Sequence, residues 1–154
     1  MSTEIERKFL VAEVPTTERL GVGQRMRQGY LADEGDVSTR IRIMDDTAVL
    51  TVKAGRGRSR TEVEFEIPVE EAEQLWQHTG GRRLEKVRYR IAVDGGVAEL
   101  DVYEGELDGL LTVEVEFDDD AAADGFVPPQ WFGSELTDDE RWTNASLARH
   151  GRPT

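Results

Sequence analysis

The stretch Glu4-Ile5-Glu6-Arg7-Lys8-Phe9 alternates along its length, with a charge at every even position. Successive side chains of a β-strand point to opposite faces, so this alternation is typical of a strand whose two faces meet different surroundings. Ile5 and Phe9 supply an apolar face, on which Arg7 is the one charged residue. We therefore predict that the chain begins with a strand that carries one charged face.

The same period recurs along the chain and predicts a fold of the α+β class that is mostly β. We expect further strands at Gln24–Leu31, Val37–Asp45, Ala48–Ala54, Ser59–Ile67, Leu84–Val93, Val97–Tyr103 and Leu111–Phe117. Short turns rich in Asp and Gly separate many of them, and such turns join antiparallel neighbours. The order suggests an antiparallel meander.

Two helices interrupt the strands. After Pro68, apolar residues recur on one face at helical spacing from Val69 to Trp76, which predicts a helix that Gly80-Gly81 ends. Near the C-terminus, Thr137 and Glu140 have the spacing of a capping box, and the helix that follows is expected to end at Gly151. We expect both helices to cover the outside of the sheet. The acidic, alanine-rich segment Asp118–Gly125 is expected to be a solvated loop.

The composition excludes several classes of protein. The chain has 154 residues, and we expect residues 1–154 to form a single domain. It contains no cysteine, which excludes disulfides, thiolate zinc sites and a cysteine nucleophile. With 19 basic and 32 acidic residues its net charge is −13, which argues against a general nucleic-acid surface. No apolar run approaches the roughly 20 residues of a membrane helix and no signal peptide is recognised, so we expect a cytoplasmic protein that binds neither nucleic acid nor membrane.

Sorting the strand residues by face gathers charges of both signs on one side and apolar residues on the other. The charged face holds Glu4, Glu6, Lys8, Arg40, Arg42, Lys53, Arg60, Glu62, Glu64, Lys86, Arg88, Asp101, Glu114 and Glu116. An open sheet with this face in water would explain the alternation. About eight strands can also close into a barrel whose interior is wide enough for one small ligand. Residue pattern alone leaves both arrangements open.

A charged barrel interior has a specific chemical meaning. An unpaired buried ion loses roughly several kcal/mol of hydration, so water, metal or ligand must complete such an interior. Arginine and lysine bind phosphoryl oxygens, and carboxylates hold Mg²⁺ or Mn²⁺. The mixture of both therefore indicates a complex of metal and polyphosphate.

The N-terminal stretch is similar to the E-x-E-x-K signature of the CYTH domain, or triphosphate tunnel metalloenzyme, family. The resemblance extends over nearly the whole chain and is closest to the short, single-domain bacterial members. It rests on Gln28-Gly29-Tyr30-Leu31, Arg40-Ile41-Arg42, Leu50-Thr51-Val52-Lys53, Arg60-Thr61-Glu62-Val63-Glu64, Lys86-Val87-Arg88, Leu100-Asp101-Val102-Tyr103 and Glu114-Val115-Glu116-Phe117. It implies a closed eight-stranded antiparallel β-barrel with a few covering helices. It also implies an enzyme that hydrolyses a triphosphate with the help of a divalent metal.

The resemblance also implies roles for the charged residues. Phosphate contacts would come from Lys8, Arg40, Arg42, Lys53, Arg60, Lys86 and Arg88. The metal residues would be Glu4, Glu6, Asp101, Glu114 and Glu116, with Mg²⁺ or Mn²⁺ as the ion. Glu62 and Glu64 would orient the basic residues or support a metal through water. Water activation would fall to a second metal, Lys86 or Tyr30, although phosphate contact for Lys86 and packing for Tyr30 are equally plain interpretations.

The substrate we expect is inorganic tripolyphosphate, cleaved to pyrophosphate and phosphate. The alternatives are a nucleoside or thiamine triphosphatase, a class IV adenylate cyclase, and a polyphosphate-binding module without activity. The expected partner is then a small-molecule triphosphate, and the sequence also allows a homodimer. Gly55-Arg56-Gly57-Arg58 lacks the Lys-Ser/Thr ending of a P-loop and is interpreted as a hairpin. Neither His78 nor His150 has metal-ligand spacing.

Overall fold

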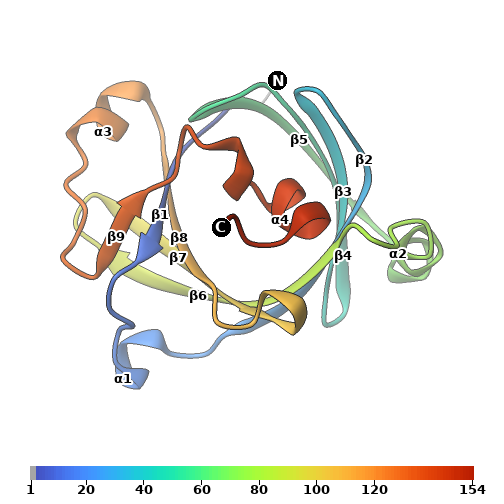
Figure 1. The fold of residues 1–154 in the computed structure, drawn as a ribbon, viewed down its shortest axis with the longest axis horizontal. Helices are drawn as coiled ribbons and strands as arrows, with labels where there is room; N and C mark the ends of the chain where they lie inside the picture. Colours follow the sequence, from blue (N-terminus) through green and yellow to red (C-terminus); the bar gives the residue numbers. More distant parts are fainter. Residues whose placement is uncertain (1–2) are drawn as a thin grey trace.

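The computed structural model describes residues 3–154, whose strands form one antiparallel sheet rolled into a ring (Figure 1). The strands are β1 (Thr3–Val11), β2 (Gln24–Glu34), β3 (Val37–Met44), β4 (Thr47–Ala54), β5 (Ser59–Ile67), β6 (Arg83–Val93), β7 (Gly96–Glu104), β8 (Leu111–Phe117) and β9 (Phe132–Glu135). Their order in the sheet is β5-β4-β3-β2-β6-β7-β8-β1-β9, and β1 also pairs with β5. The eight strands β1 to β8 thus close the ring, as the sequence predicted, and β9 is a ninth strand that pairs with β1.

The strand order departs from the meander that the sequence suggested. β6 follows β5 in the chain but pairs with β2, so that Gln28 lies opposite Leu84. Helix α2 (Val69–Trp76) makes the connection, and it packs against β3 and β4 on the outside of the ring (Figure 1). Beneath it, Ile41 and Ala48 are fully buried. The helix therefore covers an apolar part of the sheet while it carries the chain across to β2.

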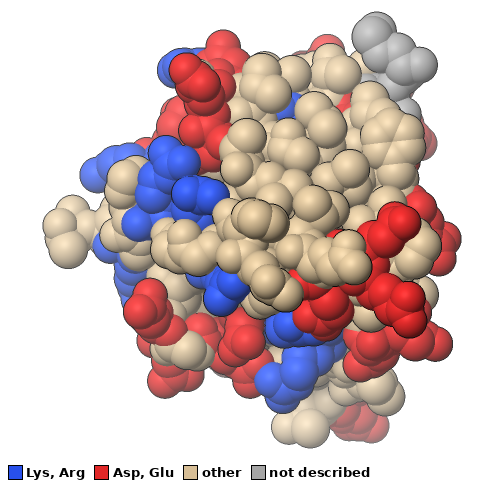
Figure 2. Space-filling view, turned by 90° about the vertical axis from the view of Figure 1, so that its right-hand side faces the viewer, with Lys and Arg blue, Asp and Glu red and all other residues tan. Residues whose placement is uncertain are grey.

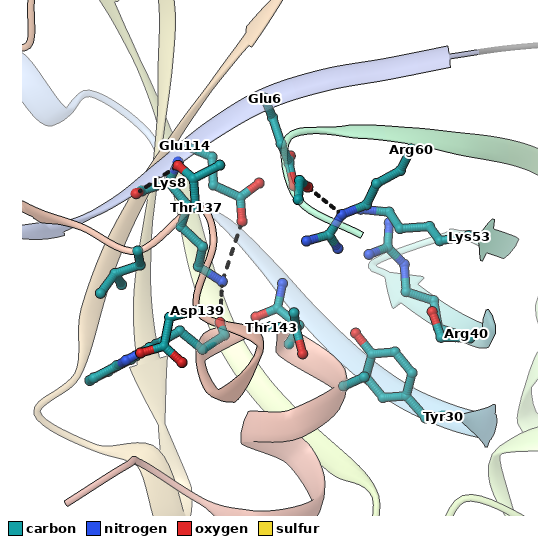
Figure 3. A pocket seen from close by; sticks show the side chains of 16 residues that line it. Glu6, Lys8, Tyr30, Arg40, Lys53, Arg60, Glu114, Thr137, Asp139 and Thr143 are labelled. Carbon is teal, nitrogen blue, oxygen red and sulfur yellow. Dashed lines mark hydrogen bonds and ion pairs between the residues drawn. The ribbon is translucent and has the colours of Figure 1, made fainter. Parts of the chain in front are cut away.

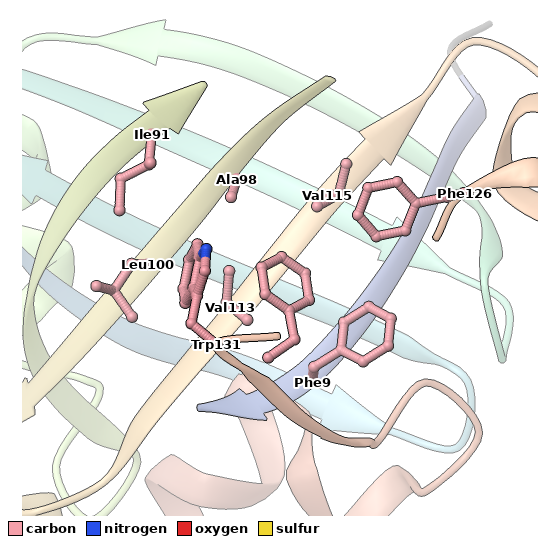
Figure 4. Close-up of a cluster of buried hydrophobic side chains, with 9 residues drawn as sticks. Phe9, Ile91, Ala98, Leu100, Val113, Val115, Phe126 and Trp131 are labelled. Carbon is pink, nitrogen blue, oxygen red and sulfur yellow. The ribbon is translucent and has the colours of Figure 1, made fainter. Parts of the chain in front are cut away.

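An apolar cluster covers the outer faces of β1, β6, β7 and β8 (Figure 4). Its buried members are Phe9, Ile91, Ala98, Leu100, Val113, Val115, Phe126, Trp131 and Phe132. Removing such side chains from water contributes about 25 cal/mol for each Å² of apolar surface. Arg7 also lies on this face, where its guanidinium is 5.3 Å from the centre of the Phe9 ring and 2.7 Å from Glu135. The charge that interrupts the apolar face in the sequence is therefore paired with an acid.

The segment expected to be a solvated loop is partly helical. Helix α3 spans Asp120–Gly125, and the Asp119 carboxylate caps it by accepting a hydrogen bond of 2.7 Å from the Ala122 amide. Ala123 is fully buried where the helix packs against β1 and β8. The expectation was wrong because the small alanine side chains allow the helix to pack closely on the sheet. A short α1 (Thr17–Leu20) and a 3₁₀ turn η1 (Gly105–Leu107) complete the connections.

The C-terminal helix begins later than expected and does not cover the outside of the ring. A 3₁₀ turn η2 (Glu140–Trp142) precedes α4 (Asn144–His150), which Thr143 caps by accepting a hydrogen bond of 3.1 Å from the Ser146 amide. Thr137 does not cap a helix, because its hydroxyl accepts a hydrogen bond from the Lys8 amide. The capping-box spacing thus occurs here without the predicted helix start.

Helix α4 packs against residues that point into the ring. Leu147 is 1% exposed and contacts a cluster that contains Leu84 and Tyr103. These two residues are two positions from Lys86 and Asp101 on the same faces of β6 and β7, so they point inward. Figure 1 shows α4 within the outline of the ring. We conclude that the C-terminal helix closes one end of the barrel interior.

Part of the outer surface is left without a cover. Val63 and Phe65 on β5 are 38% and 53% exposed. Figure 2 shows a broad uncharged area on the side of the molecule that includes α2, with acidic and basic side chains around it.

Among the helices of residues 3–154, none is long and apolar enough to cross a membrane.

Candidate active site

Two adjoining cavities lie inside the ring. The small cavity has a volume of about 50 Å³, and residues between Leu136 and Ala145 form part of its wall (Figure 3). The large cavity has a volume of about 790 Å³. Four residues line both cavities, namely Arg40, Lys53, Glu114 and Asn144. These four residues mark the place where the two cavities meet.

The structure brings most of the site residues predicted from the sequence to these walls. The small cavity is lined by Glu6, Lys8, Tyr30 and Arg60, and the large one by Glu4, Arg42, Glu62, Glu64, Arg88 and Glu116. Both cavities are lined by Arg40, Lys53 and Glu114. Lys86 and Asp101 line neither cavity within residues 3–154. Every second residue of each strand points into the ring, which explains why most of the predicted residues line the cavities.

A basic wall is formed by neighbouring strands β3 and β4. Arg40 is 6% exposed, and within residues 3–154 its Nε has no hydrogen-bond acceptor. Arg42 donates from Nε to the side-chain oxygen Oε1 of Gln28 over 2.9 Å. Burial, together with the charge of nearby Arg40, lowers the pKa of Arg42 to about 9. These cations repel one another, and a bound anion would relieve that repulsion.

An acidic cluster faces the same space. Glu4, Glu6 and Glu116 each place a carboxylate oxygen within 4.8 Å of the others. Glu6 lies opposite Glu116 in the β1–β8 pairing, which explains why they meet. Burial and the nearby Glu114 carboxylate raise the pKa of Glu6 well above its ordinary value. Burial and the charge of Glu4 raise the pKa of Glu116 to about 7.

Lys53 connects the acidic cluster to the basic wall. Its Nζ lies 2.9 Å from Glu4 and 3.5 Å from Glu62. Glu6, in contrast, has a buried Oε2 that accepts no hydrogen bond from residues 3–154. Figure 3 shows Glu6, Lys53, Arg40 and Arg60 directed toward a common space. One lysine does not neutralise three carboxylates, so this cluster suits a divalent cation.

Asp101 and Lys86 form a separate buried group with Arg88. The Asp101 carboxylate accepts hydrogen bonds from Lys86 Nζ at 2.7 Å and from Arg88 Nε at 2.8 Å. Burial alone would raise the pKa of Asp101, but the charges of Arg88 and Lys86 lower it below its ordinary value. Burial lowers the pKa of Lys86 well below its ordinary value, although Asp101 opposes the shift. The structure does not bring Asp101 into the acidic cluster of Glu4, Glu6 and Glu116.

Glu114 and Lys8 form a pair at the junction with the C-terminal segment. The Lys8 Nζ lies 3.5 Å from Glu114 and donates a hydrogen bond of 2.7 Å to the Trp142 carbonyl oxygen (Figure 3). Burial would raise the pKa of Glu114, but the charge of Lys8 and the hydrogen bond from Glu6 hold it well below its ordinary value.

The remaining predicted residues support these groups. The Tyr30 hydroxyl lies 3.4 Å from Gln28 Nε2, and the Tyr30 side chain is 3% exposed. Glu64 lies 4.0 Å from an Arg40 nitrogen, and the Arg60 Nε donates to the Gly57 carbonyl oxygen. Thus Glu62 and Glu64 both contact members of the basic wall.

The sequence did not predict two polar residues of the site. Gln28 is fully buried and holds Arg42, and its inward position could have been found from its even spacing with Tyr30 on β2. Asn144 lines both cavities from the C-terminal helix. Its position could not be found from spacing, because it depends on α4 packing inside the ring.

Comparisons with known proteins give relatives over nearly the full chain. The family profile described as CYTH domain matches residues 2–128. An inorganic triphosphatase of Nitrosomonas europaea is 47% identical over 148 residues, which cover 95% of this chain and 97% of that protein. An inorganic triphosphatase of Acetivibrio thermocellus is 38% identical and covers 97% of this chain and 96% of its own length.

The fold of this chain also resembles those of solved structures. A crystal structure of an inorganic triphosphatase superposes with a TM-score of 0.71 at 44% identity, over 97% of this chain and 96% of that chain. A protein from Pyrococcus horikoshii superposes with a TM-score of 0.56 at 21% identity, over 75% of this chain and 80% of that chain. At that identity the second likeness concerns the fold alone.

Proposed function

Because this chain belongs to the CYTH domain family, we propose that it hydrolyses inorganic triphosphate to pyrophosphate and phosphate inside its ring of strands. Two relatives that align over nearly their full length are inorganic triphosphatases. The observation that carries the proposal is the meeting of a basic wall with a cluster of three carboxylates whose members line the two adjoining cavities. A polyanion with a bound cation is complementary to both.

A divalent cation fits the acidic cluster. The carboxylates of Glu4, Glu6 and Glu116 converge within 4.8 Å, and Glu6 has a buried oxygen without a hydrogen-bond donor among residues 3–154. Hard oxygen donors of this kind suit Mg²⁺ or Mn²⁺, and we propose that these three residues hold it. A bound ion would supply positive charge that screens the phosphoryl oxygens and favours deprotonation of an attacking water.

The basic wall would bind and orient the substrate. Arg40 and Lys53 lie where the two cavities meet, and Arg42 and Arg88 line the large cavity beside them. Their guanidinium and ammonium groups would contact the phosphoryl oxygens, and Lys8 and Arg60 would do so in the small cavity. Held cations stabilise the charge that develops on the transferred and leaving phosphoryl groups without the need to reorganise solvent. Glu62 and Glu64 would keep Lys53 and Arg40 in position.

The two candidates for proton handling differ in their place. Tyr30 lines the small cavity, so its hydroxyl could contact the attacking water or a phosphoryl oxygen. Lys86 is fully buried and donates to Asp101, which also binds Arg88. We therefore propose that Lys86 acts as a positioning residue, which holds Asp101 and through it the Arg88 guanidinium at the wall of the large cavity.

The test is the release of phosphate from tripolyphosphate, pyrophosphate, ATP and thiamine triphosphate, each with Mg²⁺, with Mn²⁺ and with chelator. We expect metal-dependent turnover that is fastest with tripolyphosphate and absent in a Glu4→Gln/Glu116→Gln double variant. Pyrophosphate release from ATP with formation of a cyclic nucleotide would instead identify a cyclase. Binding of tripolyphosphate without turnover under every metal condition would contradict an enzymatic role.

A further inference from the structure

Asn144 occupies a central place in the ring, although it lies beyond the part of the chain that the family profile matches. It is the first residue of α4 and one of the four residues that line both cavities. The other three are Arg40, Lys53 and Glu114, all of them charged. A neutral amide at this junction is therefore placed among the groups that would bind the substrate.

A chain of hydrogen bonds fixes the orientation of the Asn144 amide. The Tyr103 hydroxyl donates to Asn144 Oδ1 over 2.5 Å, and Thr112 Oγ1 lies 3.3 Å from the same hydroxyl. Tyr103 has one proton to donate, so Thr112 is the donor in the second contact. Tyr103 and Thr112 are 1% and 0% exposed, so water cannot easily replace either partner. Burial also raises the pKa of Tyr103 well above its ordinary value, which keeps the phenol protonated.

This arrangement determines which atom of Asn144 is free for a ligand. Its carbonyl oxygen already accepts from Tyr103, whereas Nδ2 carries two N–H donors. Within residues 3–154, Nδ2 donates to no protein group, and it is not among the buried polar atoms without a partner. The donors of Nδ2 are thus not sealed from solvent, and Asn144 lines both cavities where they meet.

We propose that Asn144 binds a phosphoryl oxygen of the substrate through its Nδ2 donors. The inference rests on the function proposed above and adds a residue to its binding site. A phosphoryl oxygen accepts several hydrogen bonds, and a neutral donor adds one without a further cation beside Arg40 and Lys53. The Thr112–Tyr103 pair acts as a support that turns the amide toward the substrate.

An isosteric substitution separates binding from structure. Asn144→Asp keeps an oxygen that can accept from Tyr103, but it replaces the donor by a negative charge. We expect its affinity for tripolyphosphate to fall at least about tenfold with little change in melting temperature, whereas Asn144→Ala should lose about fivefold, within the range of single hydrogen bonds. Tyr103→Phe removes the support, so it should lower the melting temperature and weaken affinity less than Asn144→Asp. Arg149→Ala, an exposed change on the same helix, is the matched control.

The measurement is calorimetric titration of metal-free protein with tripolyphosphate, together with thermal unfolding of each variant. This readout does not depend on hydrolysis. Parent-like affinity in Asn144→Ala and Asn144→Asp would overturn the inference, and so would affinity losses that merely follow the losses in melting temperature. If Asn144→Asp does not fold, Asn144→Ala decides the question. A parent that binds tripolyphosphate but never hydrolyses it would contradict the proposed function only, and a parent that binds it neither without metal nor with Mg²⁺ would contradict both.

Discussion

Lys86 Nζ lies 2.7 Å from Asp101 Oδ2 in the wall of the ring, and both side chains are at most 1% exposed. Arg88 completes the group with hydrogen bonds of 2.8 and 2.9 Å to the two oxygens of the same carboxylate. The Asp101 carboxylate is thus shared by two cations, of which Arg88 also lies 3.4 Å from Glu99. Because burial removes the hydration of all three groups, the arrangement is stable only while Asp101 is ionised and present.

Asp101→Asn should therefore destabilise the protein strongly. The substitution leaves Lys86 buried without its counter-charge and Arg88 with only Glu99, 3.4 Å from its guanidinium. Breaking a buried pair in this way costs about 3–5 kcal/mol. Lys86→Met should cost clearly less, because the carboxylate keeps both hydrogen bonds from Arg88. Urea unfolding of the two variants beside the parent measures the difference. Equal losses would show that Asp101 does not carry the charge balance of this group.

The stability of the metal-free protein should fall as pH rises through the range of Glu116. The folded-state pKa of Glu116 is about 7, above the ordinary value of 4.5. Between these values the folded protein binds a proton that the unfolded chain has already lost, so raising the pH favours unfolding. Thermal unfolding from pH 5 to pH 8 with chelator should show the decline, and it should be smaller in Glu116→Gln.

Divalent metal should reverse that trend. A cation that binds the folded carboxylates and not the unfolded chain raises the melting temperature, and its binding strengthens as these groups lose their protons. We expect the increase produced by Mg²⁺ or Mn²⁺ to be larger at pH 8 than at pH 6. The increase should be absent in Glu4→Gln/Glu116→Gln. A metal effect that survives in this double variant would place the ion elsewhere.

Arg40→Ala should raise KM for tripolyphosphate about tenfold or more. Hydrogen bonds to charged groups contribute about 1.5–3 kcal/mol, and Arg40 has a buried Nε without an acceptor among residues 3–154. Arg25→Ala is a matched control, since Arg25 pairs with Glu104 and its side chain is 65% exposed. Steady-state kinetics at saturating metal compare the two variants. A parent-like KM in Arg40→Ala would remove Arg40 from the substrate-binding wall.

Leu147→Ala should loosen the C-terminal helix. Leu147 is 1% exposed and packs against Leu84, Tyr103 and Leu107, and a leucine-to-alanine change in a core costs about 2–5 kcal/mol. Val127→Ala, at a side chain that is 79% exposed, should stay within about 0.5 kcal/mol of the parent. Denaturant unfolding and hydrogen exchange of the α4 amides measure both variants. Unchanged exchange in Leu147→Ala would contradict the packing of α4 inside the ring.

Much of the fold could be predicted from the sequence, because the direction of a side chain in a strand depends only on whether its position along the strand is odd or even. The strands from Gln24 to Phe117 lie within a few residues of their expected positions, and α2 begins after Pro68 as predicted, although it ends at Trp76, before the expected stop at Gly80-Gly81. The eight-stranded ring is confirmed. The local patterns failed where packing decided the outcome, at the α3 helix and at Thr137, whose hydroxyl binds the Lys8 amide instead of capping a helix.

By itself, the sequence determined which residues share a face, and hence that acids and bases gather on the same side of the sheet. Tertiary structure decided their partners. Glu4, Glu6 and Glu116 converge because β1 pairs with β8, whereas Asp101 is withdrawn from them by Lys86 and Arg88. The position of Asn144 depends on a helix whose apolar side packs into one end of the ring. The alternation of side chains between the two faces of a strand is a local property of the backbone. The distance between two charges depends instead on strand register and on packing, which join residues far apart in the chain.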